Sequence, residues 1–314
     1  MSEVSPPPEP WVKFDPNMLS GYAIQSAGSA IYTLTLIAVY NLRKADKSIP
    51  PFYHLFFWFG VVDVIHSIAL IWMNFSINAI HGDKFEVINY VASLLTCFCY
   101  IANMIGNGLM AINRYSATYN SHHKHFSEFR TKLYIILALI ASAIFSIPAA
   151  LRQKHFQFDY ATRDWVFKIS PMALFHVQRY IILSFMVLYF LVAAIFTLMA
   201  RNRIAHFIHK DKYHKSDRTL IFFVAVHILL HVCMLIYEIG ELIVYDFIVF
   251  KFIHEYLYFS AFNLITVSNG FVILFTTEKV KKAVFKTARL FGTNKVSNQS
   301  NTQNQQVFSL AVTY

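Results

Sequence analysis

FYHLFFWFGVVDVIHSIALIWMNFSINA, residues 52–79, is the stretch of sequence that decides the class of fold. Asp63 is the only Asp, Glu, Lys or Arg among these residues, and the others are mostly apolar or aromatic. A helix needs about 20 such residues to cross about 30 Å of hydrocarbon, because each residue advances it by about 1.5 Å. The stretch therefore predicts a membrane-spanning helix with one acidic side chain near the middle of the bilayer.

Six further stretches have a similar length and a similar apolar composition. They lie at roughly 19–40, 88–112, 133–150, 172–200, 218–238 and 253–276. The whole chain is 56% hydrophobic and 14% charged, whereas average soluble domains carry about 25% charged residues. This composition excludes a soluble enzyme, whose surface needs more charge. We predict an all-α, polytopic membrane protein in which residues 19–276 form a seven-transmembrane helix bundle.

The distribution of lysine and arginine predicts which side of the membrane each loop occupies. With the N-terminus outside, the inside segments hold 19 basic residues and the outside segments 7, and one of the 27 lies within a span. Basic residues collect on the cytoplasmic side of membrane proteins, so we expect a multi-pass protein of the plasma membrane with its N-terminus outside. The loop 151–171 departs from this bias with four basic residues. The net charge of +10 is thus an orientation signal, and we expect no nucleic-acid partner.

The two ends of the chain are expected on opposite sides of the bilayer. Residues 1–18 predict a short extracellular tail, without the basic region and apolar run of a cleavable signal peptide. Residues 277–291 place basic and apolar side chains at helical spacing, which favours an amphipathic helix on the membrane surface; an ordinary basic flank is the alternative. Residues 292–314 are rich in Asn, Gln and Ser and predict a disordered cytoplasmic tail.

Polar side chains deep inside the predicted spans are candidates for function, since burying them in hydrocarbon is costly. From the helical rise, Asp63 and Asn103 each lie about 16 Å from the inner face, and Asn269 about 10 Å from it. We expect one hydrogen-bonded network between spans two, three and seven, formed by Asp63, Asn103, Asn107, Ser268 and Asn269. Such a network can hold a cation or a proton. The alternative is a protonated Asp63 bonded to a single neighbour.

A short polar motif stands where the third span meets the cytosol. Asn113, Arg114 and Tyr115 follow the last apolar residues of the span, and a basic, His-containing loop comes next. An arginine at this position can hold neighbouring spans together or reach into a docked partner, although a snorkelling arginine at a helix end is common. The three residues are therefore candidates for a switch and a partner contact.

Several of these features together resemble the plan of the G-protein-coupled receptors. They are the seven spans, the outside N-terminus, the Asn-Arg-Tyr triplet and the FTTEKVKK run at 275–282 that follows Asn269. More narrowly, NRYSATY at 113–119 and PFYHLFF at 51–57, together with Asp63, are similar to the nematode serpentine chemoreceptors, in particular their gamma superfamily.

The resemblance implies a chemosensory receptor that binds a small-molecule or peptide cue outside the cell and signals through a heterotrimeric G protein. It makes Arg114 the conformational latch, with Asn113 and Tyr115 beside it, and it makes Asp63 and Asn269 the central switch. It also implies a location in the plasma membrane, including that of a sensory cilium, and a site without cofactor or metal.

The sequence also departs from the rhodopsin-like pattern. Asn113 stands where an acid usually precedes the arginine, and Gly270 follows Asn269 in place of proline, where it still allows a bend. The loop 151–171 contains no cysteine for the usual bridge to span three. All three cysteines lie inside spans, where we expect small core residues: Cys97, Cys99 and Cys233.

Two other classes of function remain open. His227 and His231 lie four residues apart on span six, and with His66 and Asp63 they could ligate zinc as in seven-span lipid hydrolases. Those hydrolases are expected with a cytosolic N-terminus, the reverse of the orientation predicted here. A seven-span transporter is the other alternative, although the sequence shows no internal repeat. No other catalytic motif is present, so we do not expect an enzyme.

A ligand pocket is expected between the outer halves of the spans. Arg179 could meet an anionic ligand there, or pair with Glu238 or Glu255, and the sequence does not choose among these. For each candidate, packing at the membrane interface is the alternative to ligand contact. The candidate pocket residues are Thr96, Tyr100, His176, Arg179, Tyr180, His231, Glu255 and Tyr256.

Overall fold

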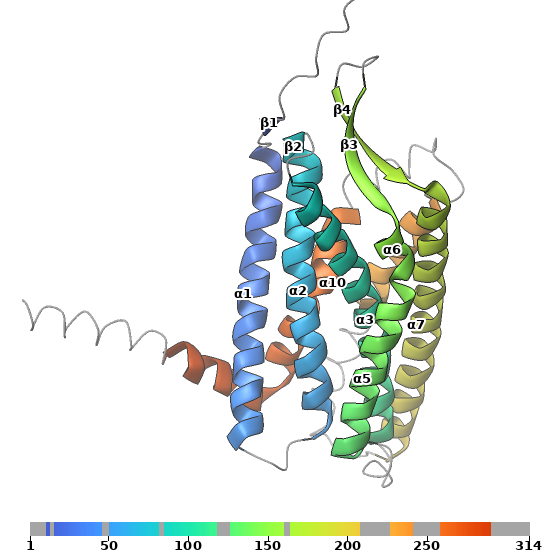
Figure 1. Ribbon diagram of the computed structural model, residues 1–314. Helices are drawn as coiled ribbons and strands as arrows, with labels where there is room; N and C mark the ends of the chain where they lie inside the picture. The colour runs from blue at the N-terminus through green and yellow to red at the C-terminus, as the bar shows by residue number, and fades with distance from the viewer. Residues whose placement is uncertain are drawn as a thin grey trace, which may run out of the picture.

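The chain folds as a bundle of long helices that run along a common direction (Figure 1). The computed structural model describes residues 11–12, 16–45, 50–81, 85–117, 126–159, 164–207, 227–240 and 258–289. The principal helices are α1 (Pro16–Ala45), α2 (Phe52–Ala79), α3 (Glu86–Ala117), α5 (Glu128–Phe145), α6 (Ile147–Leu151), α7 (Met172–Phe207) and α10 (Tyr258–Thr276). Two further helical segments cover 227–240 and 278–289.

Five of these segments are long and apolar enough to cross a membrane: Tyr22–Ala45, Phe52–Ser76, Glu86–Ser116, Glu128–Leu151 and Met172–Asn202. Two shorter apolar helices, His227–Gly240 and Phe262–Phe275, follow them in the chain. They coincide with the predicted sixth and seventh spans, of which 218–226 and 253–257 lie outside the described residues. The described residues thus contain all or part of each predicted span.

The core is formed by two clusters of buried side chains, and α3 contributes residues to both. One cluster joins α3 to α7, α10 and the 227–240 helix through Tyr100, Met186, Met234 and Ile265. A second cluster joins α1, α2 and α10 through residues that include Tyr32, which is 1% exposed. In contrast, α5 and α7 expose rows of large apolar side chains to the surroundings, as a lipid-facing surface requires: Ile136, Leu137, Ile140, Ile144, Leu188, Leu191, Ile195 and Leu198.

The fourth predicted span is broken near its outer end. Helix α5 ends at Phe145, and α6 begins at Ile147 with Pro148 in its first turn. A proline is tolerated there because its missing N–H has no partner within the helix at that position. The two helices together form the apolar segment Glu128–Leu151, which covers the predicted fourth span at 133–150.

The predicted loop 151–171 contains an antiparallel hairpin formed by β3 (Gln153–Asp159) and β4 (Asp164–Ser170). Phe156 pairs with Phe167 and Phe158 with Trp165. Phe156 and Phe158 in β3, and Trp165, Phe167 and Ile169 in β4, recur at every second position, which fits the period of two of a strand. The other strands are short: β1 (Trp11–Val12) pairs with β2 (Ile80–His81) at the same end of the bundle. We call this end the hairpin end and the opposite one the Arg114 end.

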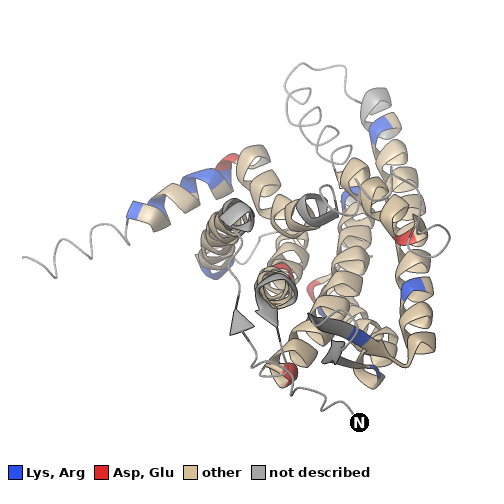
Figure 2. Ribbon diagram, turned by 90° about the horizontal axis from the view of Figure 1, so that it is seen from above, with Lys and Arg blue, Asp and Glu red and all other residues tan. Residues whose placement is uncertain are grey.

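Helix 278–289 leaves the Arg114 end and carries most of its charge on one side. Figure 2 shows lysine and arginine gathered along it. Val280 is fully buried and packs with the second core cluster, whereas Phe285 is 59% exposed. The exposed cations are Lys279, Lys281, Lys282, Lys286 and Arg289. The helix is therefore amphipathic, as its sequence spacing predicts.

Candidate functional site

A buried carboxylate lies at the centre of the bundle. Asp63 on α2 is 1% exposed, and both of its oxygens accept hydrogen bonds. Oδ1 accepts from the Asn103 amide of α3 at 2.5 Å, and Oδ2 accepts from the Tyr32 hydroxyl of α1 at 2.8 Å and from Asn269 of α10 at 3.2 Å. An intramolecular hydrogen bond contributes about 0.5–1.5 kcal/mol net. These three bonds tie α1, α3 and α10 to α2.

Asn107 closes this group of side chains into a ring. Its amide donates to the Asn103 oxygen at 2.9 Å, and its own oxygen accepts from Asn269 at 3.1 Å. The structure therefore brings together four of the five residues that the sequence places in one network. The fifth, Ser268, bonds instead to Nε2 of His227 at 2.7 Å and to the carbonyl of Ile265. Adjacent helical residues point about 100° apart, so Ser268 faces a different neighbour from Asn269.

Tyr32 is the member of the network that sequence reasoning missed. Its ring fits against α10 because residue 270 is a glycine: a Cβ built there would lie 2.5 Å from Cγ of Tyr32. Helix α10 runs from Tyr258 to Thr276 without interruption, so Gly270 provides close approach where we expected a bend. The sequence carries no signal that singles out Tyr32, because span one contains several other hydroxyl and amide side chains.

The residues proposed to ligate zinc do not form a metal site. The His66 ring packs against the rings of Tyr100 and Phe262, with centroids 6.0 and 5.1 Å away. His227 and His231 stack on each other, and Nδ1 of His231 lies 2.8 Å from the carbonyl of His227. Among the described residues, no three His, Cys, Asp or Glu side chains converge as metal ligands. The hydrolase alternative therefore lacks its ligand set there. Cys97 and Cys99 are buried, Cys233 is half-buried, and none of the three forms a disulfide with another described residue.

At the Arg114 end, the Asn-Arg-Tyr triplet lies inside the last turns of α3, which continues to Ala117. The guanidinium of Arg114 lies over the ring of Phe52, 4.9 Å from its centroid. Phe52 is the first residue of α2, so this contact joins α3 to α2. The Tyr115 ring lies 5.3 Å from Phe196 of α7, and Asn113 is buried. No carboxylate among the described residues forms an ion pair with Arg114.

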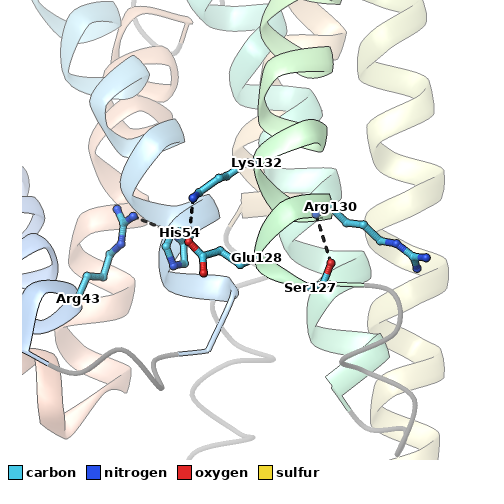
Figure 3. Close-up of polar contacts among 6 residues, drawn as sticks. All are labelled: Arg43, His54, Ser127, Glu128, Arg130 and Lys132. Atoms are coloured by element: carbon cyan, nitrogen blue, oxygen red, sulfur yellow. Dashed lines mark hydrogen bonds and ion pairs between the residues drawn. The ribbon is translucent and has the colours of Figure 1, made fainter.

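Polar contacts between α1, α2 and α5 lie at the same end (Figure 3). Nη2 of Arg43 on α1 is 2.6 Å from Nδ1 of His54 on α2. Glu128 and Lys132 form an exposed ion pair on α5, beside His54 in Figure 3. The guanidinium of Arg130 points away from this group. Exposed pairs contribute little to stability, so this end is held mainly by packing.

Toward the hairpin end, Arg179 of α7 forms an ion pair with Glu238, with Nη1 and Oε2 2.8 Å apart. The two side chains are only 12% and 7% exposed. The guanidinium also lies over the rings of Phe175 at 4.5 Å and Tyr237 at 5.5 Å. The sequence left an anionic ligand, Glu238 and Glu255 open as partners of Arg179. In the structure, Arg179 pairs with Glu238. This pair joins α7 to the 227–240 helix.

The other predicted pocket residues divide into three groups. Tyr100 and His231 are buried in the core, and the half-buried Thr96 donates to a carbonyl of its own helix. His176 and Tyr180 are exposed on α7, so the structure does not bring them into that group. Glu255 and Tyr256 lie outside the described residues.

Comparison with known families gives this arrangement a context. A family model described as serpentine type 7TM GPCR chemoreceptor Srx matches residues 22–277, which is most of the chain. The chain belongs to the Srx family of serpentine chemoreceptors. No curated protein matches it. The match confirms the predicted seven-transmembrane fold and the predicted resemblance to serpentine chemoreceptors, and it identifies a chemosensory, GPCR-like receptor.

In this Srx receptor, the matched residues contain three polar groups at successive depths. The Arg179–Glu238 pair lies toward the hairpin end, the Asp63 network lies in the middle, and Arg114 lies at the opposite end. Each group bridges different helices, so a change in the packing of one helix alters contacts at more than one depth.

Proposed function

We propose that this Srx receptor lies in the plasma membrane, including that of a sensory cilium, with its hairpin end outside the cell. Residues 1–18 then form an extracellular tail, and 277–291 lie on the inner leaflet as an amphipathic helix. Residues 292–314 form a disordered cytoplasmic tail. The count of 19 basic residues against 7 supports this orientation.

We propose further that a small-molecule or peptide cue binds toward the hairpin end and that a heterotrimeric G protein docks at the Arg114 end. The observation that carries this proposal is the Asp63 network, which couples α1, α2, α3 and α10 through one buried carboxylate. A cue that favours one arrangement of these helices shifts the population toward it. Arg114 can then leave Phe52 and contact the partner, with Asn113 and Tyr115 beside it.

Glycosylation mapping tests the orientation on which the proposal depends. An acceptor sequon placed in residues 1–10 is expected to be modified in intact cells, whereas one placed in residues 118–125 is expected to stay unmodified. The reverse pattern would place the Arg114 end outside the cell and overturn the proposal. A screen of chemical cues in cells that express a promiscuous G protein then tests the coupling itself.

A further inference from the structure

Arg152 is a buried cation without an ion-pair partner in the part of the chain that the structure describes. It follows α6 directly and is 8% exposed. Its guanidinium carbon lies 5.7 Å from the centroid of the Phe175 ring, and its Nε has no hydrogen-bond partner. No carboxylate among the described residues forms an ion pair with it. Burial lowers the pKa of Arg152 from its ordinary value; Cys97 and Glu238 raise this pKa, and Arg179 lowers it.

A buried guanidinium without an acidic partner is costly, because removing its hydration is not repaid by an ion pair. The nearest acid that the structure shows is Glu238, which is bonded to Arg179. Arg152 and Arg179 lie against the same aromatic ring, that of Phe175, so both cations belong to one small region of the bundle. An anion supplied from outside the chain would complete the coordination of Arg152.

Apart from these charged groups, the ring of Phe175 and the thiol of Cys97 lie near Arg152. The ring of Tyr100 and the thiol of Cys97 belong to the core cluster that also contains Ala149, three residues before Arg152. The Tyr100 hydroxyl is buried and has no hydrogen-bond partner. An apolar molecule with one acidic group fits such surroundings better than an inorganic ion does, because it can bury its body against the rings.

We propose that Arg152 binds the carboxylate of a small organic acid, and that such acids are the class of cue this receptor detects. The inference rests on the proposed function, in which the hairpin end faces outward. Guanidinium groups bind carboxylates through two parallel hydrogen bonds, which selects for a planar acid. A phosphate of a lipid headgroup offers related chemistry. We favour the organic acid, because protein atoms cover Arg152 and lipid contacts only the outer surface of the bundle.

Thermal unfolding of the full-length receptor in phosphatidylcholine nanodiscs tests this site without requiring G-protein coupling. Octanoate is the acidic probe and octanamide its neutral match. We expect octanoate to raise the Tm by roughly 2–4 °C and octanamide to leave it unchanged. The effect should vanish in Arg152→Gln, survive in part in Arg152→Lys and persist in full in Lys168→Gln, which removes an exposed cation of β4.

Each outcome of this experiment decides the question. A Tm that does not respond to octanoate would overturn the proposal, as would a response that Arg152→Gln retains. A response to phosphatidic acid in the nanodisc but not to octanoate would assign Arg152 to lipid and also overturn it. Octanoate binding through Arg152 without any nucleotide exchange on a G protein would support the site and contradict the proposed coupling instead.

Discussion

The side-chain amide of Asn269 lies 3.2 Å from Oδ2 of Asp63, although 206 residues separate them in the chain. The same amide bonds to Asn107, so α10 is tied to both α2 and α3 at one depth. Movement of α10 relative to either helix must break one of these two bonds. The polar network therefore fixes the position of α10 against α2 and α3.

Replacing Asp63 is expected to destabilise the receptor strongly. In Asp63→Ala, the donors of Tyr32, Asn103 and Asn269 lose their acceptor while remaining buried, and each unsatisfied group costs about 1–3 kcal/mol. Thermal unfolding of purified protein measures the loss. Ser184→Ala on the exposed side of α7 is the control and should unfold like the wild type. An Asp63→Ala protein as stable as that control would show that the network contributes nothing to the fold.

Gly270→Ala is expected to disturb the position of Tyr32. The added methyl group overlaps the Tyr32 ring, and overpacking of this kind costs about 1–3 kcal/mol. Gly108→Ala is the matched control, because its methyl group would meet only Val192, at 3.6 Å, and alanine favours a helix. Unfolding temperatures should therefore fall for the first variant alone.

A double-mutant cycle tests the cause of that loss. Gly270→Ala should cost little in a Tyr32→Ala background, where the ring is absent. If the cost is the same in both backgrounds, the close approach of Tyr32 is not the reason for the glycine.

Breaking the Arg179–Glu238 pair is expected to destabilise the hairpin end. Each single change, Arg179→Gln or Glu238→Gln, leaves a nearly buried charge without this partner, at a cost of roughly 3–5 kcal/mol. The double variant should cost clearly less than the two single changes added together, since no charge is then stranded. Unfolding temperatures of the four proteins measure the coupling, and purely additive losses would contradict it. Glu128→Gln, in an exposed pair, should have little effect.

Depth in the membrane could be predicted from the sequence, but the direction of side chains could not. The constant rise of a helix predicts the same depth for Asp63 and Asn103 and a depth within about 6 Å of it for Asn269, and the structure brings the three together. The rotation of each helix about its axis depends on packing, so Ser268 was assigned to the wrong neighbour. For the same reason the role of Tyr32 depends on Gly270, which lies on a different helix.

For the charged residues as well, the sequence predicts the position along the helix but does not predict the partner. The sequence placed Arg179 near the outer end of span five without selecting its partner, because Glu238 and Glu255 lie at similar depths. The hairpin could not be predicted because its alternation of apolar residues covers only a few positions within the loop between spans four and five. Arg152 was counted there as one of four basic residues, and nothing in the sequence shows that it is buried.

The central claim is that this Srx chain signals through a G protein by way of Arg114. The most direct test is cue-dependent nucleotide exchange on a promiscuous G protein in cells that express wild type, Arg114→Ala or Arg130→Ala at equal surface levels. Arg130 is the matched control, because it is an exposed arginine at the same end of the bundle. The account predicts that exchange is lost in Arg114→Ala and retained in Arg130→Ala. Cue-dependent exchange that is equal in all three proteins would contradict it.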